Sequence, residues 1–454
     1  MSALDRSTPP ARGSFEDFAF PTVQRRELPT GLDLRVAQLR RLPVVSLTLF
    51  MRAAESALSP DNAGLAVLAA DTLEGGTKRR SGSDLAEALE SIGARMSASA
   101  GWEGTSVSLS CLADRLPEAL TILAEAVLNP SFPEDEVRRV RDQQLAAIRQ
   151  REMDPGSLAT DEAQKRYFAP DVPYARRVQG TTDGIGGTGR DEMLAFADAN
   201  YRPGRGGLVM AGDVDPAEVR AMVLDSFGGW TGTPANLPDF EVEPDVRERR
   251  IHVVHRPGSV QSEIRVGHVG ARRSDPDYYA LSIANMVLGG MFTSRLNLNL
   301  RERHGFTYGV RSRFTFRSSP GPFQVSTAVG NEVTAPAVRE IVGELVRMAD
   351  EGPTEAEVTA ARDYSAGIFG LQLETAGQIG TRVSQLVVYE LPDDHFDHYR
   401  GRMRAVTVES AADAAGRHVR PHEAQIVLVG DADVVAAPVE ALGLGPVEVV
   451  SAVD

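Results

Sequence analysis

Cysteine is almost absent from this chain of 454 residues: the sequence contains one, Cys111. An internal disulfide is therefore impossible, and this is consistent with a protein of a reducing compartment. Cys111 stands in the alternating run 105–112, which predicts a half-buried strand. We expect a small buried residue there rather than a nucleophile.

Long apolar runs are also lacking, and none approaches the length of a membrane-spanning helix. Residues 1–27 are rich in Pro, Arg, Asp and Glu and lack the apolar centre of a signal peptide. We therefore expect a cytoplasmic protein that has no contact with membranes.

Basic residues are fewer than acidic ones: the sequence has 48 Lys and Arg and 63 Asp and Glu, which gives a formal net charge of -15. This balance argues against nucleic-acid partners, which need clustered cations. It would attract cationic peptides, although solubility alone accounts for it. With 42% hydrophobic and 24% charged residues, the composition is that of a soluble globular protein.

Histidine is missing from the first half, since all eight histidines follow residue 251. The segment Gly64–Thr77 nevertheless resembles the zinc-binding helix of the insulinase/pitrilysin family of peptidases, whose ligands run His-x-x-Glu-His. The family's ligand and base positions hold Val67, Ala70 and Asp71, and the distal Glu falls near Ala147. One carboxylate cannot hold zinc alone. We therefore expect an ordinary core helix and no metal in this chain.

An internal duplication organises the chain. Residues 133–137 resemble 353–358, and 208–215 resemble 427–433; Glu136 precedes Glu357 by 221 residues, and Gly212 precedes Gly430 by 218. Two copies of one fold of roughly 200 residues follow from this spacing. The predicted fold class is α+β: a tandem duplication of two homologous α/β-sandwich domains, each a mostly antiparallel sheet covered by helices.

The domain limits follow from composition. We predict a tail at 1–16, an N-terminal domain with the degenerate zinc site at 17–232, a linker at 233–249 rich in Pro and acidic residues, and a C-terminal domain at 250–454. In the second copy, an apolar stripe predicts a helix over 278–288, which Gly289 and Gly290 close.

The block 285–308 resembles the family's C-terminal signature and ends in its Arg/Tyr pair, Arg301 and Tyr308. The resemblance implies that both bind peptide substrate and stabilise the tetrahedral oxyanion opposite the zinc. A guanidinium and a phenol are suitable donors for that task. The spacing places Arg301 in the last turn of a helix that Gly305 ends, and Tyr308 in the next strand, on the face shared by Val310, Ser312, Phe314 and Phe316.

A structural explanation of the pair stays open, in which Arg301 offsets the negative end of its helix and Tyr308 packs beneath it. The resemblance favours the functional explanation, in which the pair binds substrate. It implies a subunit that contributes the pair to a metalloendopeptidase and is inactive alone, while a homologous partner carries zinc. The four domains would enclose a chamber for unstructured peptides, which add as a strand to a sheet edge. The alternative is a catalytically inactive structural or peptide-binding homologue, and homodimerisation of the lone chain is left open.

Other motifs in the sequence give weaker indications of a functional site. Gly184–Gly189 matches the dinucleotide fingerprint G-x-G-x-x-G, but no buried strand precedes it, which favours a glycine-rich connection. The pairs His252/His255 and His395/His398 have i, i+3 spacing, yet the first lies in a strand, where such residues face opposite sides. We expect surface or core roles for these four and for His304.

Overall fold

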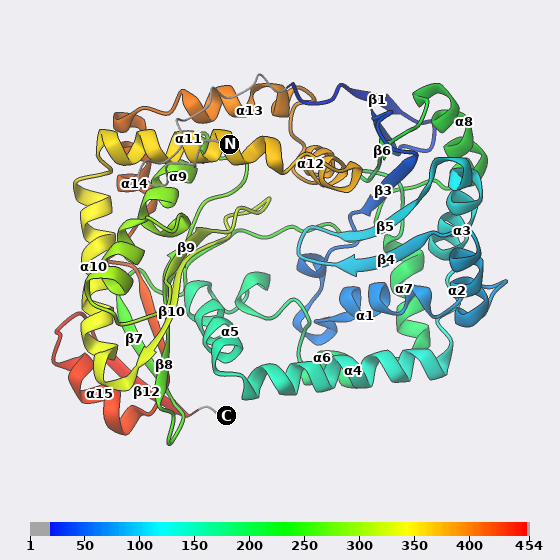
Figure 1. The fold of residues 1–454 in the computed structure, drawn as a ribbon. Helices are drawn as coiled ribbons and strands as arrows, with labels where there is room; N and C mark the ends of the chain where they lie inside the picture. Colours follow the sequence, from blue (N-terminus) through cyan, green and yellow to red (C-terminus); the bar gives the residue numbers. More distant parts are fainter. Residues whose placement is uncertain (1–18, 452–454) are drawn as a thin grey trace, which may run out of the picture.

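The computed structural model describes residues 19–451, so the tail predicted at 1–16 lies outside the described residues. Two halves lie side by side, each built on a six-stranded sheet (Figure 1). The first sheet has the order β1 (Val23–Glu27), β2 (Asp33–Gln38), β6 (Gly207–Gly212), β3 (Val44–Met51), β5 (Thr105–Leu112), β4 (Arg95–Ala100). The second has the order β12 (Val447–Ser451), β7 (Arg250–His255), β11 (Gln425–Gly430), β8 (Gln261–Val269), β10 (Pro322–Gly330), β9 (Arg311–Phe314).

The two sheets repeat one topology. In each, one parallel pair, β2 with β6 or β7 with β11, is followed by antiparallel neighbours out to β4 or β9. The other edge differs, because β1 precedes β2 and pairs antiparallel, whereas β12 comes from the end of the chain and pairs parallel. The predicted tandem duplication with mostly antiparallel sheets is confirmed.

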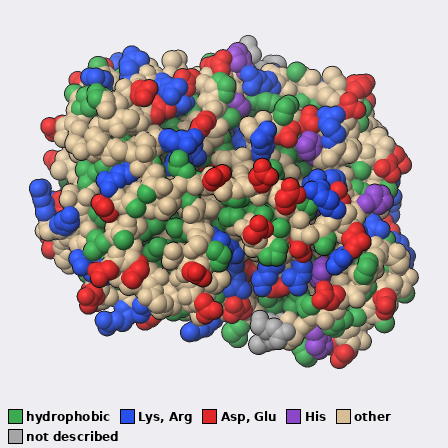
Figure 2. Space-filling model, turned by 180° about the vertical axis from the view of Figure 1, so that it is seen from behind, with side chains coloured by type: hydrophobic (Ala, Val, Ile, Leu, Met, Phe, Trp, Pro, Cys, Tyr) green, Lys and Arg blue, Asp and Glu red, His purple; other side chains and the backbone are tan. Residues whose placement is uncertain are grey.

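The surface carries mixed charge. On the face shown in Figure 2, basic and acidic side chains are interspersed. Within residues 19–451, no helix combines the length and the apolar character that crossing a membrane requires.

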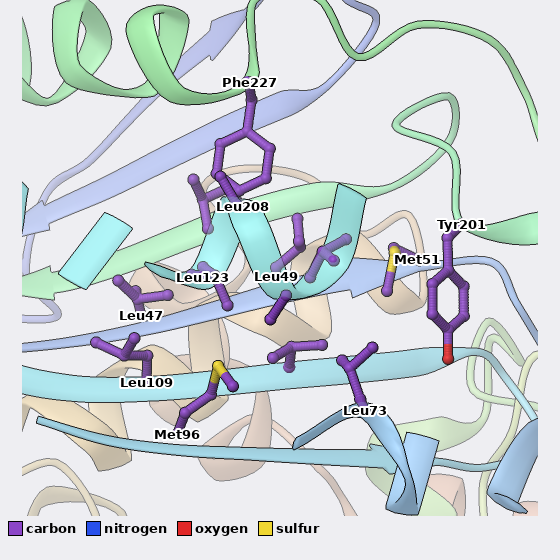
Figure 3. Close-up of a cluster of buried hydrophobic side chains, with 14 of the residues drawn as sticks. Leu47, Leu49, Met51, Leu73, Met96, Leu109, Leu123, Tyr201, Leu208 and Phe227 are labelled. Atoms are coloured by element: carbon purple, nitrogen blue, oxygen red, sulfur yellow. The ribbon is translucent and has the colours of Figure 1, made fainter. Parts of the chain in front are cut away.

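Helices cover the outer face of each sheet. Those of the first half include α1 (Leu65–Asp71), α2 (Gly82–Ser91), α3 (Leu116–Leu128), α4 (Glu134–Met153), α6 (Thr182–Gly186), α7 (Arg190–Asn200) and α8 (Pro216–Phe227). Those of the second include α9 (Tyr278–Asn285), α10 (Thr334–Asp350), α11 (Glu355–Leu371), α13 (His395–Arg404), α14 (Val408–His418) and α15 (Ala432–Glu440). Figure 3 shows the first core, where Leu47 and Leu49 of β3 and Leu208 of β6 meet Leu123 of α3 and Phe227 of α8.

The inner face of each sheet is covered by a helix from the other half. Helix α5 (Pro155–Tyr167) packs on the second sheet, where Leu158 and Tyr167 join one cluster with Val427 and Val429 of β11. Helix α12 (Ala376–Val388) packs on the first sheet, where its apolar side chains cluster with Val209 and others of β6. Figure 1 shows both helices between the sheets. The halves are therefore interlocked.

A glycine in each sheet permits this close packing. At Gly267 of β8, a Cβ would lie 2.2 Å from the Phe323 carbonyl oxygen and 2.7 Å from the Tyr167 ring of α5. At Gly207 of β6, a Cβ would lie 2.8 Å from a methyl carbon of Val387 in α12. Only glycine fits these positions without displacing a neighbour.

Residues 233–249, the predicted linker, contain no helix or strand. The segment is nevertheless tied to the first half: the Ala169 amide donates to the Glu243 carbonyl at 3.0 Å, and the rings of Phe240 and Tyr174 meet edge to face at 5.3 Å.

Candidate functional site

The degenerate zinc positions lie on two helices of the first half. Val67 and Ala70 are buried in α1, and Asp71 is exposed at its end. Ala147 is exposed on α4. Helix α4 packs on α1, and the Gln144 amide donates to the Gly64 carbonyl at 3.2 Å. The residues at the family's positions offer one carboxylate and no imidazole, which does not fit zinc.

A buried carboxylate holds the start of α1. Gly64 precedes the helix with φ of 97°, and its amide donates to Glu55 Oε1 at 2.7 Å. Glu55 is fully buried, and Arg176 lies at 4.0 Å. Burial raises the pKa of Glu55 to about 8 against the opposing effects of the Gly64 amide and Arg176. Sequence analysis missed this residue because no motif marks it.

Arg301 lies where it was predicted, near the end of a helical segment. That segment is the π-helix η7 (Asn297–Arg303), and Gly305, with φ of +65°, follows it. Tyr308 departs from the prediction: β9 begins only at Arg311, and the Tyr308 side chain is 100% exposed. It does not share the buried face of Val310, Ser312 and Phe314, nor does it pack beneath Arg301.

Arg301 and Tyr308 line one cavity of about 900 Å³, which we call the clamp cavity. Its other walls come from α5, α9, α11 and the open face of β9 and β10. The Arg301 guanidinium lies over the Phe292 ring, 4.5 Å from its centroid. This contact holds the cation beside the cavity while its donors stay available. Both members of the predicted pair therefore reach the same space.

Asn297 ties the two sides of this site together. Its Nδ2 donates to the Val310 carbonyl at 2.9 Å, and its Oδ1 accepts from the Val310 amide at 3.2 Å. Thr307 Oγ1 donates to the Gly309 carbonyl at 3.0 Å. The backbone on either side of Tyr308 is thus anchored while its phenol projects outward. Asn297 lay in the recognised block, but spacing alone gave it no role.

Residues 43–171 match the family described as Insulinase (Peptidase family M16), and residues 189–364 match Peptidase M16 inactive domain. Together these ranges span more than half of the 454 residues. The chain belongs to the insulinase family of peptidases.

Relatives within the family extend over most of the chain. An uncharacterized zinc protease of Mycobacterium tuberculosis is 27% identical over 412 residues, covering 90% of this chain and 93% of the relative. A solved peptidase M16 inactive domain from Pseudomonas fluorescens has a TM-score of 0.84 and 27% identity, covering 90% of this chain and 98% of that one. Subunit 1 of the Bos taurus mitochondrial cytochrome b-c1 complex is 24% identical over 273 residues, covering 59% of this chain and 56% of the relative.

Two clusters outside the insulinase-family zinc position bring together residues of the kind that bind metals. They are His255 with Asp431 and Asp433, and Asp275 with Asp277 and His418. In the first, the Ala432 amide donates to His255 Nδ1 at 3.1 Å. In the second, Arg417 donates to both Asp277 oxygens at 2.9 Å. Protein donors already engage these groups, so both clusters act as structural contacts.

The remaining sequence candidates take structural places. Residues 184–186 end α6, α7 follows at Arg190, and residues 168–181 before them contain no strand, so the dinucleotide context is missing. Burial raises the pKa of Cys111 to about 11, which leaves its thiol protonated and inert.

The paired histidines do not share a site. His252 is buried and bonds Gln425, whereas His255 ends β7 and accepts from the Ala432 amide at the start of α15. His395 is buried beside Arg273, and its burial lowers its pKa to about 4, whereas His398 is exposed beside Asp394. His304 is exposed and stacks on Phe306, with the ring centroids 4.8 Å apart.

Proposed function

We propose that this chain is the non-zinc-binding subunit of a two-subunit metallopeptidase. Its part is to bind an unstructured peptide in the clamp cavity and to stabilise the transition state. What supports the proposal is that Arg301 and Tyr308 line one open cavity while the zinc position of the same chain holds Val67, Ala70 and Asp71. A homologous partner with an intact His-x-x-Glu-His helix would bring the metal.

The chemistry of the pair suits a developing oxyanion. The Arg301 guanidinium carries a fixed charge and several donors, and the exposed Tyr308 phenol adds a neutral donor. Donors that are positioned before the reaction stabilise the transition state without reorganisation. Arg301 would orient the peptide carbonyl, and Tyr308 would donate to its oxygen as charge develops there.

No residue of β4 lines the clamp cavity, so sheet-edge pairing would involve a part of the peptide outside the cavity, and β4 is the better candidate edge. At the edge strand β9, the Asn285 Nδ2 already donates to the Ser312 carbonyl at 3.2 Å, which blocks added strand pairing. At β4, the hydrogen bonds between backbone groups of the described residues run to β5 alone. Figure 1 shows β4 at the margin of the first sheet, beside α1. Main-chain pairing there would tolerate varied sequences.

The second candidate function is that of a structural or peptide-binding subunit without a part in catalysis. The loss of the zinc ligands favours it, as does the similarity to a subunit of the cytochrome b-c1 complex. The full exposure of Tyr308 and the partial exposure of Arg301 beside the same cavity favour the first candidate, since a purely structural Arg/Tyr pair would be expected to pack inward. We propose the cytoplasm as the compartment, in keeping with the single free thiol of Cys111.

The test is reconstitution with a zinc-bearing family member encoded by the same genome, followed by cleavage of an extended peptide. Arg301→Ala should lower kcat/KM by roughly 100-fold or more, as loss of an oxyanion donor does, and Tyr308→Phe by about tenfold or more. Arg339→Ala, on the exposed face of α10, is the control and should leave activity unchanged. Full activity of both clamp variants in an assembled pair would refute the assignment and favour the structural candidate.

A further inference from the structure

The clamp cavity has a charge opposite to that of the whole molecule. Four arginines line it: Arg301, Arg311, Arg313 and Arg317. Among the described residues of its lining there is no Asp, Glu or Lys. The chain as a whole has a formal net charge of -15, so this concentration of cations is not a consequence of composition.

Two of the arginines share one face of the edge strand β9. Arg311 and Arg313 are exposed, while Ser312 and Phe314 between and beyond them are buried. Alternation along a strand therefore directs both guanidinium groups to the cavity side. Within the described part of the chain, neither has a hydrogen bond or an ion pair.

The other two arginines also lack a close-fitting carboxylate. Arg301 rests on Phe292, and its nearest acidic partner is its exposed neighbour Glu302, with Nε and Oε1 3.7 Å apart. Arg317 lies over the Tyr174 ring, 4.1 Å from its centroid, and its Nη1 is buried without a hydrogen-bond partner. Glu103 acts on Arg317 electrostatically but forms no ion pair with it, so the charge of this largely buried cation is incompletely balanced and an arriving carboxylate would be stabilised here.

The cavity also presents acceptors that suit a peptide backbone. The side-chain oxygens of Gln164 on α5 and Gln324 on β10 are buried and have no hydrogen-bond partner, and both residues line the cavity. Gln324 stands opposite Arg313 in the β9–β10 register. Once these side-chain amides turn toward the cavity, peptide N–H groups would satisfy their oxygens, whereas an inorganic anion could not. A peptide is therefore the better occupant.

We propose that the clamp cavity selects acidic peptides, with Arg311 and Arg313 binding carboxylates two residues apart on an extended segment. Side chains at i and i+2 of an extended chain are about 6.6 Å apart, as are those of Arg311 and Arg313 along their strand. The inference deepens the proposed function and rests on it in one respect, that this cavity holds the peptide. It reverses the expectation from net charge, that cationic peptides would be favoured.

The test measures binding of fluorescent peptides to the isolated full-length chain by anisotropy. Three extended peptides differ only at two alternate positions, which carry Glu, Gln or Lys. The Glu peptide should bind most tightly and the Lys peptide least. Arg311→Gln combined with Arg313→Gln should reduce the preference for Glu over Gln by at least about threefold, because exposed ion pairs contribute modestly.

Arg220→Gln combined with Arg339→Gln is the control matched for net charge, since it removes two exposed positive charges, from α8 and α10, outside the cavity, and should leave the preference unchanged. Equal affinity for the Glu and Gln peptides, an equal loss in the control, or no binding of any peptide would overturn the proposal. These outcomes are separable from those of the proposed function, because the binding assay needs no partner and reconstituted cleavage needs no acidic preference.

Discussion

At the scale of single residues, the first half shows how a metal position can be lost while its helix is kept. Leu65, Ala66, Leu68 and Ala69 of α1 all belong to buried core. The helix is therefore held by packing, to which the buried Val67 and Ala70 at two of the former zinc-site positions also contribute. Glu55, which accepts from the Gly64 amide, fixes the start of the helix.

Glu55 makes stability depend on pH. Its folded pKa, about 8, lies above its unfolded value of about 4.3. Its stabilising contribution is thus fully present below about pH 4 and is lost as pH rises through 8, because the buried carboxyl must ionise. Glu55→Gln keeps an acceptor for Gly64 and removes the charge. We expect the free energy of unfolding of the variant, relative to that of the wild type, to rise by a few kcal/mol between pH 5 and pH 9.

The measurement is urea unfolding of both proteins at pH 5, 7 and 9. Parallel pH profiles of the two proteins would show that Glu55 does not titrate in this range.

The sequence predicted that Arg301 and Tyr308 share one site, but it did not predict the structure that surrounds them. Arg301 was located correctly because Gly305 marks a helix end. Tyr308 was assigned to the strand because alternation from 308 to 316 looks continuous, although β9 starts only at Arg311. Whether a residue before a strand turns outward depends on contacts such as those of Asn297 with Val310, which a pattern does not encode.

At the scale of elements, the repeat spacing predicted two copies and mostly antiparallel sheets. The predicted helix over 278–288 is α9 to Asn285 and a π-helical turn from Met286 to Gly290. The turn is set by packing: a Cβ at Gly289 would lie 2.5 Å from the Ser312 amide nitrogen. The exchange of α5 and α12 was not predictable, since an apolar stripe does not reveal which sheet it will cover.

The packing of α5 on β8 depends on Gly267. Gly267→Ala would place a Cβ against the Phe323 carbonyl and the Tyr167 ring. We expect a loss of about 1–3 kcal/mol in the free energy of unfolding, as overpacking of a core produces. Gly343→Ala is the control, because it lies in α10 with nothing within 4 Å of its Cβ, and it should stabilise by about 0.5–1 kcal/mol. Equal stability of Gly267→Ala and the wild type, measured by chemical denaturation, would contradict this account of the packing.

At the scale of the whole molecule, the two halves are interlocked rather than joined only by a linker. Each sheet takes its inner covering helix from the other half, and the segment 233–249 is pinned beside α5 and η5 (Pro173–Ala175). The cavity with Arg301 and Tyr308 opens where α5 of the first half meets β9 and β10 of the second. The site thus depends on the duplication as a unit.

The central claim is that this chain binds and orients the peptide while another chain supplies the metal. The most direct measurement is the zinc content and peptide cleavage of the purified full-length protein, first alone and then mixed in equal amounts with the zinc-bearing relative. The account predicts zinc far below one ion per chain and no cleavage alone, with cleavage appearing on mixing. Stoichiometric zinc in the isolated chain together with unaided cleavage would contradict it.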